Sequence, residues 1–148
     1  MRRGSSGNSK MSIRRTSVRL FDESLIIMHF ILLVYEHAQN WAKQSKDEKN
    51  RIHEACGAWH EKLVKSGHAR TAMGLHPVST ANTVRQKEGK PLLTDGPFAE
   101  TKEVLGGFEV VECKDHNEAV EIAKTFPALR LGFAMEVRQL RSDGCHED

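Results

Sequence analysis

The chain has 148 residues, of which 39% are hydrophobic and 28% charged, and this predicts a single domain with enough length for a hydrophobic core. Of the 22 basic and 20 acidic side chains, residues 1–27 hold six and two, which leaves 16 basic and 18 acidic groups for the rest. The body of the chain therefore lacks the basic surplus that nucleic-acid binding requires, and we expect no nucleic-acid partner.

The N-terminal segment, residues 1–27, is predicted to be a disordered basic extension or a start-site artefact. Basic residues followed by the apolar run at 25–35 have the layout of a secretory signal. However, Asp22 and Glu23 directly precede the run and His29 interrupts it, so a cleaved signal is the less favoured alternative. The run is also too short to span a bilayer, and we expect no membrane partner.

The domain begins with MHFILLVY at residues 28–35, an apolar run that predicts a strand buried on both faces. A helix is predicted from Ser45 or Asp47 to Lys65, with Gly67 as its C-cap. Apolar residues recur along this segment with helical spacing and predict one buried face, made of Ile52, Ala55, Cys56, Trp59 and Leu63.

Strands and a second helix make up the rest of the domain. The composition predicts strands at 69–75, 107–113 and 132–140, and a hairpin of 81–86 and 91–94 with its turn at Glu88–Lys90. Asp115 is predicted to open the second helix, because Glu118 follows at the spacing of a capping box. Pro127 ends this helix. Residues 142–148 are predicted to be a polar tail.

This order of elements predicts an α+β fold, a ferredoxin-like sandwich in which two helices cover one face of the sheet. The opposite face of such a sheet is left bare. A second copy of the chain is the simplest way to cover it, so we expect a homodimer.

Cysteine and histidine usage indicates the compartment and the cofactor class. Cys56, Cys113 and Cys145 show no CxxC spacing, which favours reduced thiols and a cytoplasmic location. The eight histidines form no metal-ligand pattern, and no phosphate-binding or dinucleotide motif occurs. We therefore expect no metal site and no cofactor.

One segment carries a specific motif. DGPFAETKE at residues 95–103, followed by LGGF at 105–108, resembles the signature of the YCII-related, DGPF-domain family of small bacterial proteins. HFILLVY, TANTVR and MEVRQL agree with that family in the same order, and the resemblance covers about residues 28–140. It implies a dimeric α/β-barrel arrangement of ferredoxin-like units, and a YCII-related domain at 28–141.

The resemblance also implies where a site lies. Some members of the wider group look like small-molecule enzymes, including a dehydrochlorinase of chlorinated aromatic compounds, and they place a His–Asp pair in a cleft at the sheet. Asp95 matches the aspartate of the DGPF motif. The histidine lies on the first helix in that wider group, where this chain has His53 and His60, although DGPF members commonly lack it.

Each of these residues also has a purely structural interpretation. Asp95 before Gly-Pro is typical of a turn or of a helix cap. His53 and His60 are seven residues apart, which places them at the edge of the apolar stripe and too far apart to share a metal ion. Glu100 and Lys102 are typical of a solvated surface, but Phe98 and a glycine pair beside them favour a functional loop.

The sequence therefore predicts a small-molecule-binding protein, with catalysis left open. As an enzyme it would carry out cofactor-free proton transfer, an isomerisation or an elimination, on a small aromatic or enol-like substrate. Asp95 would be the base or orient an imidazole, His60 or His53 would carry the proton, and Phe98, Glu100 and Lys102 would bind substrate. The alternatives are a non-catalytic ligand-binding or accessory protein and an interaction module that docks through residues 1–24.

Overall fold

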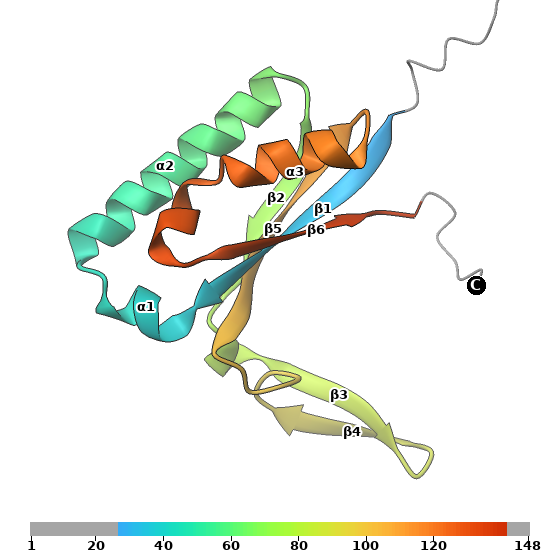
Figure 1. Ribbon diagram of the computed structural model, residues 1–148. Helices are drawn as coiled ribbons and strands as arrows, with labels where there is room; N and C mark the ends of the chain where they lie inside the picture. Colours follow the sequence, from blue (N-terminus) through green and yellow to red (C-terminus); the bar gives the residue numbers. More distant parts are fainter. Residues whose placement is uncertain (1–26, 142–148) are drawn as a thin grey trace, which may run out of the picture.

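The first strand, β1 (Met28–His37), lies inside a four-stranded antiparallel sheet with the order β2-β5-β1-β6. The computed structural model describes residues 27–141 (Figure 1). The other strands of this sheet are β2 (Ala69–Gly74), β5 (Glu103–Cys113) and β6 (Ala134–Gln139). Cys145, the predicted tail at 142–148 and nearly all of the predicted N-terminal extension lie outside the described residues.

The predicted long helix is confirmed as α2 (Lys46–Lys65). Its N-cap is Ser45, whose side-chain oxygen accepts a hydrogen bond from the backbone N–H of Glu48 at 3.1 Å. The chain leaves the helix through Gly67 at φ +82°, a left-handed conformation that glycine adopts without strain. The predicted apolar stripe is also confirmed, since the helix buries Ile52, Trp59 and Leu63.

The second predicted helix is α3 (His116–Lys124), and Asp115 caps it by accepting from the backbone N–H of Glu118 at 2.8 Å. The Glu118 carboxylate reaches one residue further back than a capping box requires and accepts from Lys114 at 2.7 Å. A short 3-10 helix, η3 (Pro127–Leu131), follows.

One helix was not predicted. The short α1 (Ala38–Lys43) follows β1 directly and buries no residue. Six residues are too few to show an apolar stripe, so no periodic pattern indicates this helix.

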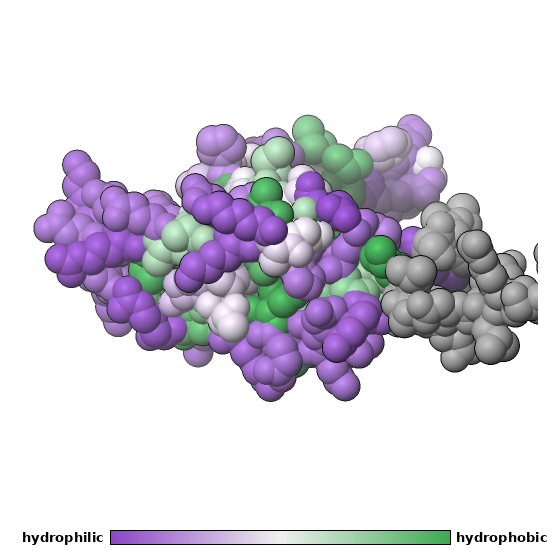
Figure 2. All heavy atoms as spheres, turned by 90° about the horizontal axis from the view of Figure 1, so that it is seen from above, coloured by the Kyte–Doolittle hydropathy of each residue, from purple (hydrophilic) through white to green (hydrophobic). Residues whose placement is uncertain are grey.

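The hydrophobic core lies between the sheet and the helices, which cover one face of it (Figure 1). Phe30, Leu32 and Val111 have no exposed surface, and they pack with Trp59 and Leu63 of α2. Seen from above, the surface is mostly hydrophilic, and hydrophobic side chains show only in small separate areas (Figure 2). This arrangement confirms the predicted ferredoxin-like α+β fold, although the sheet within residues 27–141 does not close into a barrel.

The hairpin of β3 (Asn82–Lys87) and β4 (Lys90–Asp95) forms a separate two-stranded sheet that projects away from the body (Figure 1). Its turn lies at Glu88 and Gly89, which both have positive φ, 51° and 77°, as a tight two-residue hairpin turn requires. The hairpin follows a 3-10 turn, η2 (Val78–Thr80), and its strands agree with the predicted ranges 81–86 and 91–94 to within one residue at each end.

The segment after the hairpin differs from the prediction. Strand β5 begins at Glu103, four residues before the predicted start, because β1 also continues past its predicted end and pairs with it. A bulge between Val34 and Tyr35 shifts the register and lets Glu36 and His37 pair with Val104 and Glu103. The glycine pair therefore lies inside the central sheet and not in a loop.

Candidate functional site

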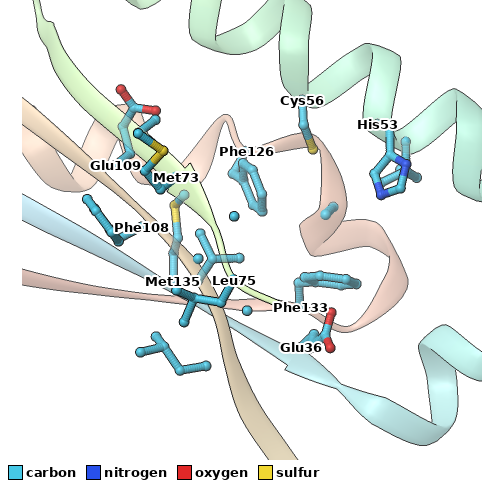
Figure 3. Close-up of a pocket in the computed structure, with 18 of the residues that line it drawn as sticks. Glu36, His53, Cys56, Met73, Leu75, Phe108, Glu109, Phe126, Phe133 and Met135 are labelled. Atoms are coloured by element: carbon cyan, nitrogen blue, oxygen red, sulfur yellow. The ribbon is translucent and has the colours of Figure 1, made fainter. Parts of the chain in front are cut away.

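A cavity of about 460 Å³ lies between α2, the segment around η3 and the end of the sheet where β1, β2 and β5 meet (Figure 3). Most of its wall is apolar or aromatic. The ionisable residues that line it are Glu36, His53, Cys56, His60, His76 and Glu109. A concave, largely apolar space with a few polar groups is the usual form of a small-molecule site.

His60 and Glu109 form a pair in the wall of this cavity. The Nδ1 atom of His60 lies 2.9 and 3.1 Å from the two carboxylate oxygens of Glu109. The Glu109 side chain is only 4% exposed, whereas that of His60 is 38% exposed. The Glu109 carboxylate is therefore enclosed by protein, whereas the His60 ring is partly exposed.

The fold explains why Glu109 is buried. It alternates along β5 with Val111 and Cys113, which both lie in the core, so its side chain faces the helices. Burial raises the pKa of Glu109, and the hydrogen bond and charge of His60 oppose that rise. A carboxylate that accepts at Nδ1 leaves Nε2 of the imidazole available to exchange a proton with a ligand.

Aromatic rings surround the rest of the cavity. The ring of Trp41 lies 5.4 Å from that of His53 and 5.6 Å, edge to face, from that of Phe133. Trp59 and Phe126 form a second edge-to-face pair at 5.2 Å. Flat apolar surfaces of this kind fit an aromatic or other planar ligand.

The structure separates the predicted site residues into two groups. His53 and His60 line the cavity, but Asp95, Phe98, Glu100 and Lys102 do not. Asp95 ends β4, where its carboxylate accepts a hydrogen bond from the side chain of Asn82 at 2.8 Å. These four residues lie at the base of the hairpin and in the exposed segment that follows it.

Phe98 has a local role at that place. Its side chain is 76% exposed, and the guanidinium carbon of Arg85 lies 5.2 Å above its ring. Arg85 also donates to the Phe98 backbone oxygen at 2.8 Å. These contacts attach the segment after the hairpin to β3.

The sequence analysis missed both carboxylates of the cavity, Glu36 and Glu109. In GFEVVEC the apolar residues fall on both alternating sets, so the pattern does not reveal which face is buried. Glu109 is the single acid between Gly107 and Val111, but only the folded sheet shows that it faces inward, where a buried acid requires a partner.

Neither a metal centre nor a membrane span is found in the described part of the chain. Within residues 27–141, no group of three His, Cys, Asp or Glu side chains could hold a metal ion. None of the helices in that range is long and apolar enough to cross a bilayer.

Comparison with known proteins agrees with the motif. Residues 28–141 match the YCII-related domain. The chain is also 34% identical, over 97 residues, to an uncharacterized protein of Rhizobium meliloti (strain 1021). That alignment covers 66% of this chain and 78% of the Rhizobium protein.

Proposed function

The chain belongs to the family of proteins with a YCII-related domain, and we propose that it binds a small aromatic or enol-like molecule in the cavity and moves a proton on it without a cofactor. The observation that carries the proposal is the pair of His60 and Glu109 in the cavity wall. A buried carboxylate that orients an imidazole at a ligand-sized apolar space is the arrangement that general acid–base catalysis uses.

His60 is the proton carrier in this proposal. Nδ1–H donates to Glu109, so Nε2 accepts a proton from a carbon or hydroxyl of the ligand. Glu109 stabilises the imidazolium that forms. The same nitrogen then returns the proton to another atom of the ligand, which completes an isomerisation, or passes it to a leaving group, which completes an elimination.

In this proposal Glu109, and not Asp95, orients the imidazole, which is the role that the sequence analysis assigned to Asp95. Asp95 hydrogen-bonds Asn82 and is exposed, whereas Glu109 holds the imidazole directly. His53 lines the same cavity beside Trp41 and is placed to contact the ligand body.

The second candidate function is ligand binding without chemistry. The bond from His60 to Glu109 also ties α2 to β5, and such a link stabilises a fold whether or not a proton moves. The cavity would then serve a binding or accessory protein.

Proton exchange from a neutral probe separates the two. We expect the protein to accelerate exchange of the benzylic protons of phenylacetone with D₂O, measured by ¹H NMR. His60→Asn and Glu109→Gln should each lower this rate by on the order of 100-fold while the probe still binds. His68→Asn is the matched control, because His68 pairs with Glu118 at 3.3 Å and does not line the cavity. Binding of the probe with no acceleration over buffer would establish the ligand-binding alternative.

We also propose that the chain pairs with a second copy of itself through the face of the sheet that the helices leave uncovered. Ile31, Leu33 and Val110 alternate with the buried residues of β1 and β5 and are only half-buried. The hairpin exposes Val84 and Leu93, which pair across its strands and are 67% and 64% exposed.

A second copy suits these surfaces better than an unrelated partner does. An isolated two-stranded hairpin is marginally stable in water, so its apolar side chains need a surface to pack against. Each copy has both an uncovered sheet face and a hairpin that needs a surface to pack against. In a symmetric dimer each copy can therefore supply what the other needs.

A further inference from the structure

Glu36 is the second carboxylate of the cavity, and Figure 3 shows it on the side away from Glu109. It lies near the end of β1, after the bulge that turns the strand. In the described part of the chain its carboxylate makes no hydrogen bond and no ion pair, although the side chain is half-buried. Burial raises the pKa of Glu36, and nothing in its surroundings offsets that rise.

Gly106 lies against the Glu36 side chain. A Cβ atom added at Gly106 would lie 3.3 Å from a carboxylate oxygen of Glu36 and 3.4 Å from the carboxyl carbon. The glycine therefore leaves room for this carboxylate to remain beside the strand and at the cavity wall. Any larger residue would force the carboxylate to move.

The cavity wall contains carboxylates but no permanently cationic side chain. Two carboxylates and three histidines line the cavity, and no lysine or arginine does so. Lys102, which the sequence analysis assigned to hold an anion, is exposed elsewhere. An anionic ligand would find no fixed countercharge in this wall, whereas a cationic ligand would find an unpaired carboxylate.

Aromatic rings of the cavity also suit the apolar body of such a ligand. Phe133 lines the cavity together with Glu36, and the ring of Trp41 lies 5.6 Å from that of Phe133. The Lys49 ammonium already lies 5.5 Å from the centroid of the Trp41 ring, so this ring has a cation partner and the charged group of the ligand depends on Glu36.

We propose that Glu36 binds a protonated amine, so that the ligand is a small arylalkylamine whose apolar body extends toward His60. This rests on the proposed function, because it specifies the ligand of the same cavity. The Glu36 end fixes the charged group of the ligand, and the aromatic walls hold its body.

Two probes of similar size and opposite charge test the proposal: 2-phenylethylammonium and 3-phenylpropanoate, titrated at pH 7 with binding followed by calorimetry and by the NMR signal of His60. We expect the amine to bind on the order of 10-fold or more tightly than the acid, because a charge-assisted hydrogen bond forms only with the amine. Glu36→Gln, which keeps the shape and removes the charge, should abolish this difference. Glu121→Gln, on the exposed side of α3, should not change it.

A second variant addresses the position of the carboxylate and not its charge. Gly106→Ala should weaken amine binding and leave binding of neutral phenylacetone nearly unchanged, because the added methyl group moves the Glu36 carboxylate.

The remaining outcomes separate the two proposals. If the acid binds as tightly as the amine, or if Glu36→Gln leaves the preference intact while the His60 signal responds, the Glu36 subsite is wrong and the cavity function stands. If amine, acid and phenylacetone all fail to perturb His60 at millimolar concentration, both proposals are wrong.

Discussion

An added Cβ atom at Gly107 would lie 2.8 Å from the backbone oxygen of Met73, closer than any real Cβ contact. At Gly106 the nearest neighbour is instead the flexible Glu36 side chain, at 3.3 Å. Two adjacent glycines therefore exist for different reasons. Gly107 allows β5 to approach β2, and Gly106 gives room to a cavity carboxylate.

We predict that Gly107→Ala destabilises the fold by about 1–3 kcal/mol, since backbone atoms of β2 must move to admit the methyl group. Gly106→Ala should cost less, because a side chain can rotate away. Urea unfolding of both variants measures the difference in the free energy of unfolding. Equal losses for the two would show that the close approach at Met73 does not constrain the sheet.

Single residues were the hardest feature to predict. His53 and His60 were named because the family resemblance implies a histidine on the first helix, and both line the cavity. Glu36 and Glu109 were missed because they lie on strands whose apolar residues occupy both faces, so only the three-dimensional sheet shows which face the helices cover. No local pattern indicates that Glu109 and His60, 49 residues apart, meet across the core.

At the scale of the elements, two aspartates that lie at element ends have different structural roles. Asp115 precedes α3 and accepts from a backbone N–H of its first turn at 2.8 Å. Asp95 ends β4 and accepts from the Asn82 side chain at the same distance on an exposed surface. The first bond satisfies a helix terminus, and the second replaces a bond that water can also make.

Asp115→Ala is therefore expected to lower the free energy of unfolding by about 1 kcal/mol, the usual cost of losing an N-cap. Asp95→Ala should lower it by less than about 1 kcal/mol, because the bond it removes is exposed. Thermal or urea unfolding of the two variants in parallel provides the comparison. A larger loss of unfolding free energy for Asp95→Ala would show that Asp95 stabilises the fold by more than its one exposed hydrogen bond.

Local signals predicted nearly every element but not where the longest strand begins. Asp115 was predicted to open α3, Ser45 was one of the two predicted starts of α2, and the turn at Glu88 and Gly89 lies within the predicted Glu88–Lys90. A few neighbouring residues determine each of these features. The start of β5 depends on how far β1 extends beside it, and the register of this pairing shifts between Val34 and Tyr35. Pairing between distant segments is not encoded in a short window of sequence.

At the scale of the whole molecule, the order of strands and helices was enough to predict the ferredoxin-like fold, because short right-handed connections leave few topologies for that order. The cavity was predicted less well. It is built from β1, β2, β5, α2 and the η3 region together, and the motif that marks the family lies at the hairpin instead.

The proposed pairing of two copies belongs only to this scale. Leu33 lies at the uncovered face of β1, opposite Phe108 on β5 and Glu136 on β6. Leu33→Arg places a charge there that Glu136 can balance within one chain, so the single chain should stay folded. In a dimer the same charge would be buried between two sheets, together with its symmetry mate.

We therefore expect wild type to sediment as a dimer and Leu33→Arg as a monomer, with circular dichroism unchanged. Glu121→Arg, on the exposed side of α3, is the control and should remain dimeric. A wild-type chain that stays monomeric at every concentration would contradict the pairing. A Leu33→Arg chain that stays dimeric would place the contact elsewhere, and the exposed pair of Val84 and Leu93 on the hairpin would then be the surface to change next.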